Sequence, residues 1–220
     1  MGVVNVTPDS FSDGGRYLDA EAAVAHAIQL VEEGADLLDI GAESTRPGAD
    51  PVDEAEELRR AIPVVTAVAR AVTVPISIDT SKASVAPAAL DAGAVLVNDV
   101  TALRGDPAMA EVIARTGAGI VLMHMQGTPR TMQQVPHYED VISEVAAFFE
   151  ERIRFATTHG IGQRQIVLDP GIGFGKLLVH NLTLLARLHR FAYFRCPLLV
   201  GVSRKTFLGQ LVDRPVQERQ

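Results

Sequence analysis

Polar side chains that could take part in binding or catalysis recur through this sequence at or just after the ends of short apolar runs. They are Asn5, Asp39, Asp79, Asn98, Asp99, His124, Asp169 and Ser203. A carboxylate that ends a buried strand costs free energy unless it is paired or used. Asp79 therefore favours a functional role, although Thr80 or Ser81 could cap a following helix without it. A carboxylate beside an amide, as with Asp79 and Asn98, suits the donor edge of a planar nitrogen heterocycle.

The segment 41–48, with the sequence GAESTRPG, carries the residue types that bind an oxyanion. The guanidinium of Arg46 can hold a phosphate with two parallel hydrogen bonds, and Thr45 adds a hydroxyl group. The alternative interpretation is a surface turn with a solvated arginine. The rigidity of the Arg-Pro-Gly sequence favours the oxyanion site.

The segment 169–176, DPGIGFGK, combines a carboxylate with three glycines and one aromatic residue. It matches neither the P-loop pattern, because Pro170 and Leu177 stand at required positions, nor the spacing of the dinucleotide motif. The glycines let the backbone approach a ligand closely, and Phe174 can stack on a flat ring. Lys205, in the sequence SRK, follows another apolar run and can reach between Asp79 and Asp169.

The first polar loop, 5–15 (NVTPDSFSDGG), is long and carries one aromatic side chain, Phe11. Asn5 could place a neutral oxygen on a cation, and the loop could act as a lid over a site. A plain surface loop fits its composition equally well.

These residues need elements that bring strand ends together, and the chain alternates short apolar runs with longer amphipathic ones. We predict seven strands, at 2–6, 36–40, 75–79, 95–99, 119–123, 165–169 and 197–202. We predict helices at 20–33, 53–72, 82–92, 107–116, 138–159 and 179–191, and one from about Arg204. Asp19 would cap the first helix, and Pro63 would kink or divide the second.

Strands that are apolar on both faces indicate a parallel sheet covered by helices. Such a series fits either a doubly wound open sheet or a (β/α)₈ barrel. The polar residues decide between them, because a barrel collects all strand ends in one ring, whereas an open sheet concentrates them at one switch point. We predict a single barrel domain over 1–220, truncated after the seventh strand because too few residues follow it.

Composition excludes several classes of protein. The 220 residues carry a formal net charge of −7, which argues against nucleic acid or a membrane surface as partner. No apolar run is long enough to span a bilayer. The single cysteine, Cys196, allows no internal disulfide and fits a reducing compartment. We therefore expect a cytoplasmic protein. Homodimer formation stays open.

Seven segments in order resemble the dihydropteroate synthase family, whose members fold as (β/α)₈ barrels. They are NVTPDSFSDGG, GAESTRPGA, SIDTSK, VNDV, LMHMQGTPRTMQ, LDPGIGFGK and GVSRK. The resemblance covers nearly the whole chain. It implies a folate-pathway transferase that condenses p-aminobenzoate with 6-hydroxymethyl-7,8-dihydropterin pyrophosphate and releases pyrophosphate in the presence of Mg²⁺.

The resemblance also implies a role for individual residues, motif by motif. Asp79, Asn98, Asp169 and Lys205 would bind the pterin ring, with Met123 and Phe174 against its faces. Thr45 and Arg46 would hold the pyrophosphate, and Asn5 would bind Mg²⁺. Phe11, Pro47 and Ser203 would border the p-aminobenzoate site. We expect Arg46, Asp79, Asp169 and Lys205 to carry catalysis.

One family feature is not in this sequence: an Arg-x-His motif on the last strand, which would lie beyond Gln220. Its absence suggests one of the two other functions that stay open, the second below. One is a methyltetrahydrofolate:corrinoid methyltransferase, whose pterin-binding barrel is related. The other is a pterin-binding paralogue without catalysis. The first loop, the STRPG sequence and the SRK sequence favour the synthase.

Overall fold

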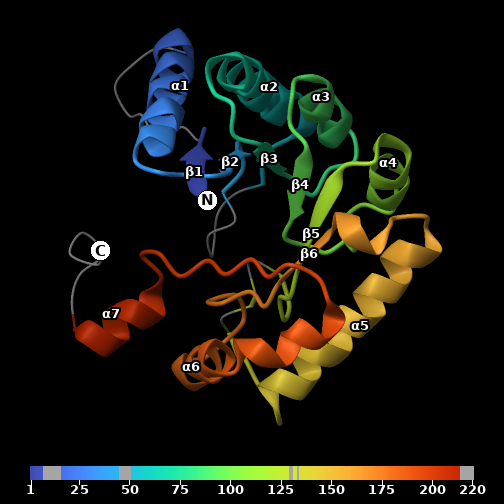
Figure 1. Cartoon of the computed structure of the whole chain (residues 1–220). Coiled ribbons are helices and arrows are strands. Elements are labelled where there is room, and N and C mark those ends of the chain that lie inside the picture. Colours follow the sequence, from blue (N-terminus) through green and yellow to red (C-terminus); the bar gives the residue numbers. More distant parts are fainter. Residues whose placement is uncertain (7–15, 45–50, 129–130, 133, 214–220) are drawn as a thin grey trace.

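The computed structural model describes residues 1–6, 16–44, 51–128, 131–132 and 134–213. Its six strands form one parallel sheet in which each strand pairs with the next along the chain (Figure 1). They are β1 (Gly2–Asn5), β2 (Leu38–Gly41), β3 (Ile76–Asp79), β4 (Leu96–Asp99), β5 (Gly119–Met123) and β6 (Ile166–Asp169). This sequential order is that of a (β/α) barrel, and it differs from the order of a doubly wound sheet, which reverses at a switch point.

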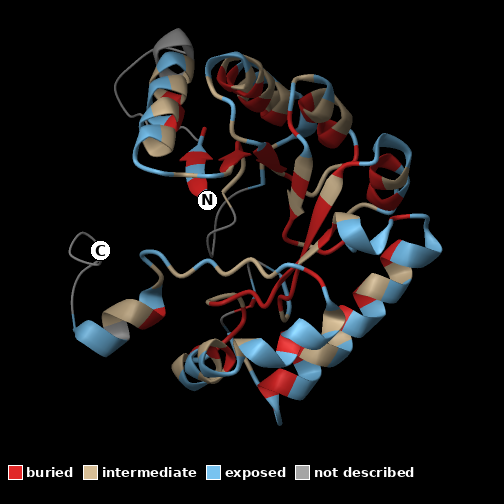
Figure 2. Cartoon of the chain, viewed as in Figure 1, coloured by how far each residue is buried: buried red, intermediate tan, exposed pale blue. Residues whose placement is uncertain are grey.

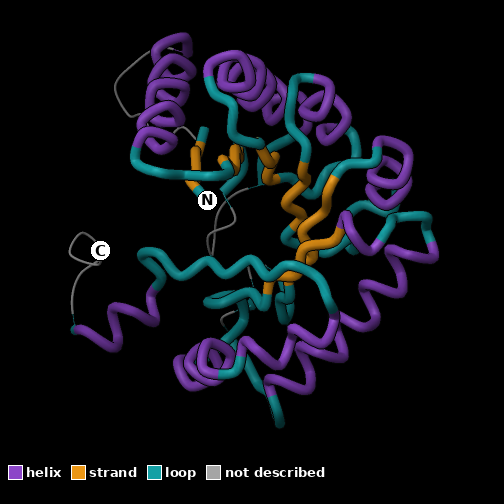
Figure 3. The backbone as a smooth tube through the Cα atoms, viewed as in Figure 1, coloured by secondary structure: helices purple, strands orange, loops and turns teal. Residues whose placement is uncertain are grey.

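The helices lie outside the curved sheet and the strands lie inside, as Figure 3 shows. The α-helices are α1 (Arg16–Glu32), α2 (Glu54–Ala71), α3 (Val85–Asp91), α4 (Met109–Thr116), α5 (Val141–Thr158), α6 (Leu178–Ala186) and α7 (Thr206–Val212). Two 3₁₀ segments, η2 (Gln163–Gln165) and η3 (Leu188–Phe194), complete the set. None of the helices in the described part of the chain is long and apolar enough to cross a membrane.

Strands β2, β3, β5 and β6 are largely buried on both faces, whereas β1 exposes Val3 and Asn5 on one face. The inner sides of the helices close over the sheet (Figure 2). All four residues of β2 are buried. Leu38, Ile40, Ile78, Ile120 and Leu122 are fully enclosed and belong to one continuous apolar core. The predicted parallel sheet with helices over it is therefore confirmed.

Several predicted helix boundaries were wrong. Helix α1 begins at Arg16, so position 19 lies within the helix and is not its N-cap position. Helix α2 is not divided at Pro63, and Asp53 caps it by accepting a hydrogen bond from Glu56 N. The predicted helix 179–191 is divided into α6 and η3.

The predicted seventh strand, 197–202, is also a correction. The segment forms a single parallel bridge, between Leu198 and Leu168, instead of a regular β-strand. Leu168 N donates to Pro197 O, and Leu199 N donates to Leu168 O, both at 2.9 Å. The pairing of this segment with β6 is limited to that one bridge. The segment therefore continues the strand series without becoming a regular strand.

Candidate functional site

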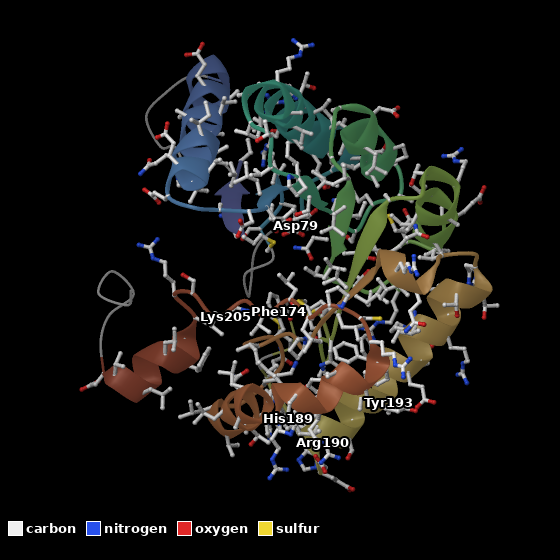
Figure 4. The ribbon with its side chains drawn as sticks, viewed as in Figure 1. Asp79, Phe174, His189, Arg190, Tyr193 and Lys205 are labelled. Carbon is white, nitrogen blue, oxygen red and sulfur yellow. The ribbon has the colours of Figure 1, made fainter. Side chains whose placement is uncertain are left out.

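The ends of β2, β3 and β4 bring the first group of predicted site residues together. Asp79 is the register partner of both Gly41 and Asn98. Gly41 leaves room for this carboxylate, because a Cβ atom there would lie 3.2 Å from Asp79 Cβ. In Figure 4, Asp79 lies across the interior from Phe174 and Lys205, whereas His189, Arg190 and Tyr193 lie away from them on η3.

Asp79 lies in a strongly acidic environment. Burial raises the pKa of Asp79 well above its usual value, and the nearby carboxylates of Asp39, Glu57, Asp99 and Glu43 add to the rise. A buried carboxyl group in such surroundings favours a ligand that brings hydrogen-bond donors or positive charge.

Asp169 ends β6 with its side chain only 8% exposed. Its Oδ1 accepts a 2.7 Å hydrogen bond from Gly171 N. Burial raises the pKa of Asp169, and the bond from Gly171 and the charges of Lys205 and Lys176 oppose the rise. The carboxylate has further acceptor sites beyond this one backbone bond.

Lys205 and Phe174 form a pair beside Asp169. The Nζ atom of Lys205 lies 4.6 Å from the centroid of the Phe174 ring, within cation–π range. The same Nζ donates to Ile172 O. Burial lowers the pKa of Lys205, and the charge of Asp169 opposes the fall. Lys205 therefore lies near the β6 end, and its predicted position between Asp79 and Asp169 stays a prediction.

Met123, at the end of β5, supplies an apolar surface to the same region. It belongs to a small cluster with Val100, Met125 and Met132, against which Phe174 packs. Met123 is also the register partner of Asp169. A flat ring near Asp169 would thus meet apolar side chains and polar acceptors together.

Asn98 is tied to a buried carboxylate that the sequence analysis did not assign. Its Nδ2 donates to Asp39 Oδ2 at 2.9 Å, and Ser77 Oγ donates to Asp39 Oδ1. Asp39 is 4% exposed. The sequence held a signal for the place of Asp39. Residues two apart share a strand face, and Asp39 precedes Gly41 by two positions, so it shares the face of Gly41 on β2.

Two other buried groups have structural roles. Asp99 accepts hydrogen bonds from Thr101 N at 2.8 Å and Leu103 N at 2.7 Å, so its acceptor sites serve the loop after β4. Lys176 is 4% exposed, and its Nζ lies 2.9 Å from both Phe174 O and His124 Nδ1. Lys176 thus joins the loop after β6 to the end of β5.

Lys82 contacts the 41–48 segment in the part that the structure describes, residues 41–44. Its Nζ contacts Glu43 of that segment and Glu57 of α2. Glu57 is fully buried, and among the described residues no hydrogen-bond partner reaches its Oε1. Burial lowers the pKa of Lys82, but the bonds to the two glutamates outweigh it and raise the pKa above the usual value.

The remaining predicted site residues are either exposed or outside the described part of the chain. Asn5 ends β1 and is exposed, and Ser203 is exposed in the turn before α7. Four residues, Phe11, Thr45, Arg46 and Pro47, lie outside the described residues. Among the described residues no group of three or more His, Cys, Asp or Glu side chains could hold a metal ion.

The sequence matches the family described as "Pterin binding enzyme" over residues 1–220. The dihydropteroate synthase of Escherichia coli K12 is 50% identical over 219 residues, which cover 100% of this chain and 77% of that protein. This chain belongs to the dihydropteroate synthase family. The enzyme of the same name from Bacillus subtilis 168 is 43% identical over 219 residues, covering 100% of this chain and 74% of that protein.

Solved dihydropteroate synthases agree with this assignment. The Yersinia pestis enzyme, determined in complex with a sulfonamide drug, shares 49% identity with a TM-score of 0.93, over 99% of this chain and 79% of that one. The Xanthomonas albilineans enzyme with 4-aminobenzoic acid shares 51% identity with a TM-score of 0.91, over 98% and 76%. The barrel fold and the transferase activity expected from the sequence are those of this dihydropteroate synthase family.

Proposed function

We propose that the pterin ring of 6-hydroxymethyl-7,8-dihydropterin pyrophosphate binds between the β3–β4 ends and the β6 end. Asp79, Asn98 and Asp169 would accept hydrogen bonds from its amino and ring N–H groups. Lys205 would lie beside its acceptor atoms. Met123 and Phe174 would contact its faces. A ring with several donors is matched by several acceptors around an apolar surface.

The observation that carries this proposal is the environment of Asp169. It is a buried carboxylate with one backbone hydrogen bond, next to the paired Lys205 and Phe174. Burying such a group costs free energy, and binding a ligand with two parallel donors would offset that cost. A purely structural carboxylate is expected to be saturated by backbone donors, as Asp99 is.

The pyrophosphate would be held by Thr45 and Arg46, with Asn5 offering its side-chain oxygen to Mg²⁺. Asn5 fits this role because it is exposed at the end of β1 and has an oxygen donor. Mg²⁺ commonly keeps several waters and binds few protein groups besides substrate phosphates. When bound, Mg²⁺ would supply positive charge against the leaving pyrophosphate.

The chemistry would proceed at the methylene carbon attached to the ring. The carbon–oxygen bond breaks and pyrophosphate leaves with the electron pair, which Arg46 stabilises. The resulting positive charge is shared with the pterin ring, near Asp79 and Asp169. The amino nitrogen of p-aminobenzoate then forms the new carbon–nitrogen bond and releases one proton to solvent.

The p-aminobenzoate would lie beside Phe11, Pro47 and Ser203. An aromatic acid needs an apolar contact and a polar group for its carboxylate, which these residue types can provide. A sulfonamide, which resembles p-aminobenzoate in shape, would compete at this position. Cytoplasmic location and the absence of nucleic-acid or membrane partners stay predictions from the sequence, and homodimer formation stays open.

A pyrophosphate-release assay tests this function. We expect multiple-turnover release that requires both substrates and Mg²⁺, because p-aminobenzoate must react with the cation before the site can turn over. Release should stop when a chelator is added and resume with excess Mg²⁺. Arg46→Ala should lower kcat by at least about a hundredfold, the scale of one lost transition-state contact. Release without p-aminobenzoate at the same rate, or no release under any condition, would contradict the proposal.

A further inference from the structure

We propose that Asp39 is a positioning residue that fixes the carboxamide of Asn98 so that its oxygen faces the pterin. The consequence is selectivity for a ring that presents a hydrogen-bond donor at this place. This inference rests on the proposed function. It assigns a role to a residue that does not itself contact the ring.

The strand register places Asp39 one layer below the proposed pterin-binding residues. Asp39 is the register partner of Ser77, and Asp79 is the register partner of Asn98. Ser77 and Asp79 are two positions apart on β3, so their side chains share one face. Asp39 therefore lies diagonal to Asn98, on the far side of β3.

The small side chain of Ser77 permits this diagonal contact. Asp39 Oδ2 lies 2.9 Å from Asn98 Nδ2, although β3 separates the two strands. The other oxygen of Asp39 is occupied by Ser77 Oγ. A larger residue at position 77 would stand between the two side chains.

The contact assigns the two ends of the Asn98 carboxamide. An ionised carboxylate only accepts hydrogen bonds, so the atom facing Asp39 must be the amide nitrogen. Burial raises the pKa of Asp39, and the bonds from Ser77 and Asn98 oppose the rise. Protonation at Oδ1 would reverse only the bond to Ser77, because Oδ2 would still accept from Asn98.

With its nitrogen held by Asp39, Asn98 presents Oδ1 at the end of β4. Together with Asp79 and Asp169, it makes this edge of the barrel rich in acceptors. Without Asp39 the carboxamide could rotate and present its NH₂ group to the ring. A ring with an oxo group in place of the amino group would then be bound more easily.

The test compares 6-hydroxymethylpterin with the corresponding lumazine, in which the 2-amino group is an oxo group. Affinities for both are measured by calorimetry in the wild type, Asp39→Asn, Asn98→Asp and the double variant Asp39→Asn/Asn98→Asp. Thermal melts establish that each variant is folded. Ser77→Ala is the matched control, because it removes a bond to Asp39 but keeps the bond to Asn98.

We expect Asp39→Asn to lose about tenfold in pterin affinity, the effect of one buried hydrogen bond, and to lose preference for pterin over lumazine. The double variant should recover both. In it, the amide introduced at position 39 would donate to the carboxylate introduced at position 98, whose second oxygen still accepts from the ring. Asn98→Asp alone should bind poorly, because it places two carboxylates together. The control should keep the wild-type preference.

Wild-type affinity and preference in folded Asp39→Asn would overturn the inference. So would a folded double variant that binds no better than Asn98→Asp. If Asp39→Asn alone does not fold, this second comparison decides the matter. A wild-type protein that binds neither ring would contradict the proposed function itself, and the inference would fall with it.

Discussion

The Nζ atom of Lys176 lies 2.9 Å from Nδ1 of His124, and both side chains are buried. Burial and the neighbouring charges of Lys176 and Arg104 lower the pKa of His124 to about 3. The imidazole is therefore neutral, and an unprotonated ring nitrogen can accept from the lysine. Nζ of Lys176 also donates to Phe174 O at 2.9 Å, so this lysine holds the Phe174 loop against β5.

Burial lowers the pKa of Lys176 to about 7, with Asp169 opposing the fall and Lys205 adding to it. Between pH 7 and about 10.5 the unfolded chain binds a proton that the native state does not. Stability should therefore rise with pH in this window, by at most about 1.4 kcal/mol per pH unit. Lys176→Met should flatten this rise.

Urea unfolding at pH 7.0 and pH 9.5 measures the effect. The control is Arg115→Met on α4, where the side chain is exposed and the pH dependence should stay that of the wild type. An equal pH dependence in the wild type and in Lys176→Met would show that Lys176 is charged throughout this range.

The Lys82–Glu57 contact gives a second prediction. Lys82→Met should destabilise the protein by about 3–5 kcal/mol, because it leaves the fully buried carboxylate of Glu57 without its cation. Adding Glu57→Gln should recover much of that loss. Chemical denaturation of the single and double variants measures both effects.

The exposed pair Arg59–Glu56 is the matched comparison. Arg59→Ala should change the stability little, as the loss of an exposed ion pair usually does. A loss in Lys82→Met no larger than the loss in Arg59→Ala would mean that the burial of Glu57 does not depend on Lys82.

Gly171 is required by close packing. Its φ is +65°, and a Cβ atom there would lie 1.9 Å from His124 O. We expect Gly171→Ala to destabilise the protein by more than about 3 kcal/mol and to displace the loop that carries Phe174. Gly34→Ala is the control: φ there is +101°, but nothing lies within 4 Å. Thermal melts of both variants test this, and similar melting temperatures would contradict it.

The strand–helix series was predictable from sequence because apolar runs of four or five residues and their spacing reflect burial directly. The 197–202 segment shows the limit of that argument, since its composition is strand-like but only Pro197 to Leu199 bond to Leu168. Local composition does not report how many neighbours a strand will have. Pro63 does not divide α2, which runs unbroken from Glu54 to Ala71, so the choice between a kink and a division could not be made from the proline alone.

The candidate site was predictable where a polar residue ends a strand, as with Asp79 and Asp169. The role of Asp39 was not predicted, because its contact with Asn98 crosses an intervening strand and depends on three-dimensional register. Lys176 was also missed, since a lysine after a glycine-rich segment is usually solvated. Its burial follows only from the packing of the loop on His124.

Pterin binding by Asp169→Asn is the most direct test of the proposed site. Calorimetric titration with 6-hydroxymethylpterin should show binding to the wild type and a loss of about 1.5–3 kcal/mol or more in the variant, because the amide would turn its NH₂ group, a donor, toward one of the two ring donors. The variant should still fold, since its side-chain oxygen can accept from Gly171 N. Asp99→Asn is the control: it should lower the melting temperature and change the pterin affinity little. Equal pterin affinity in the wild type and in folded Asp169→Asn would contradict the account.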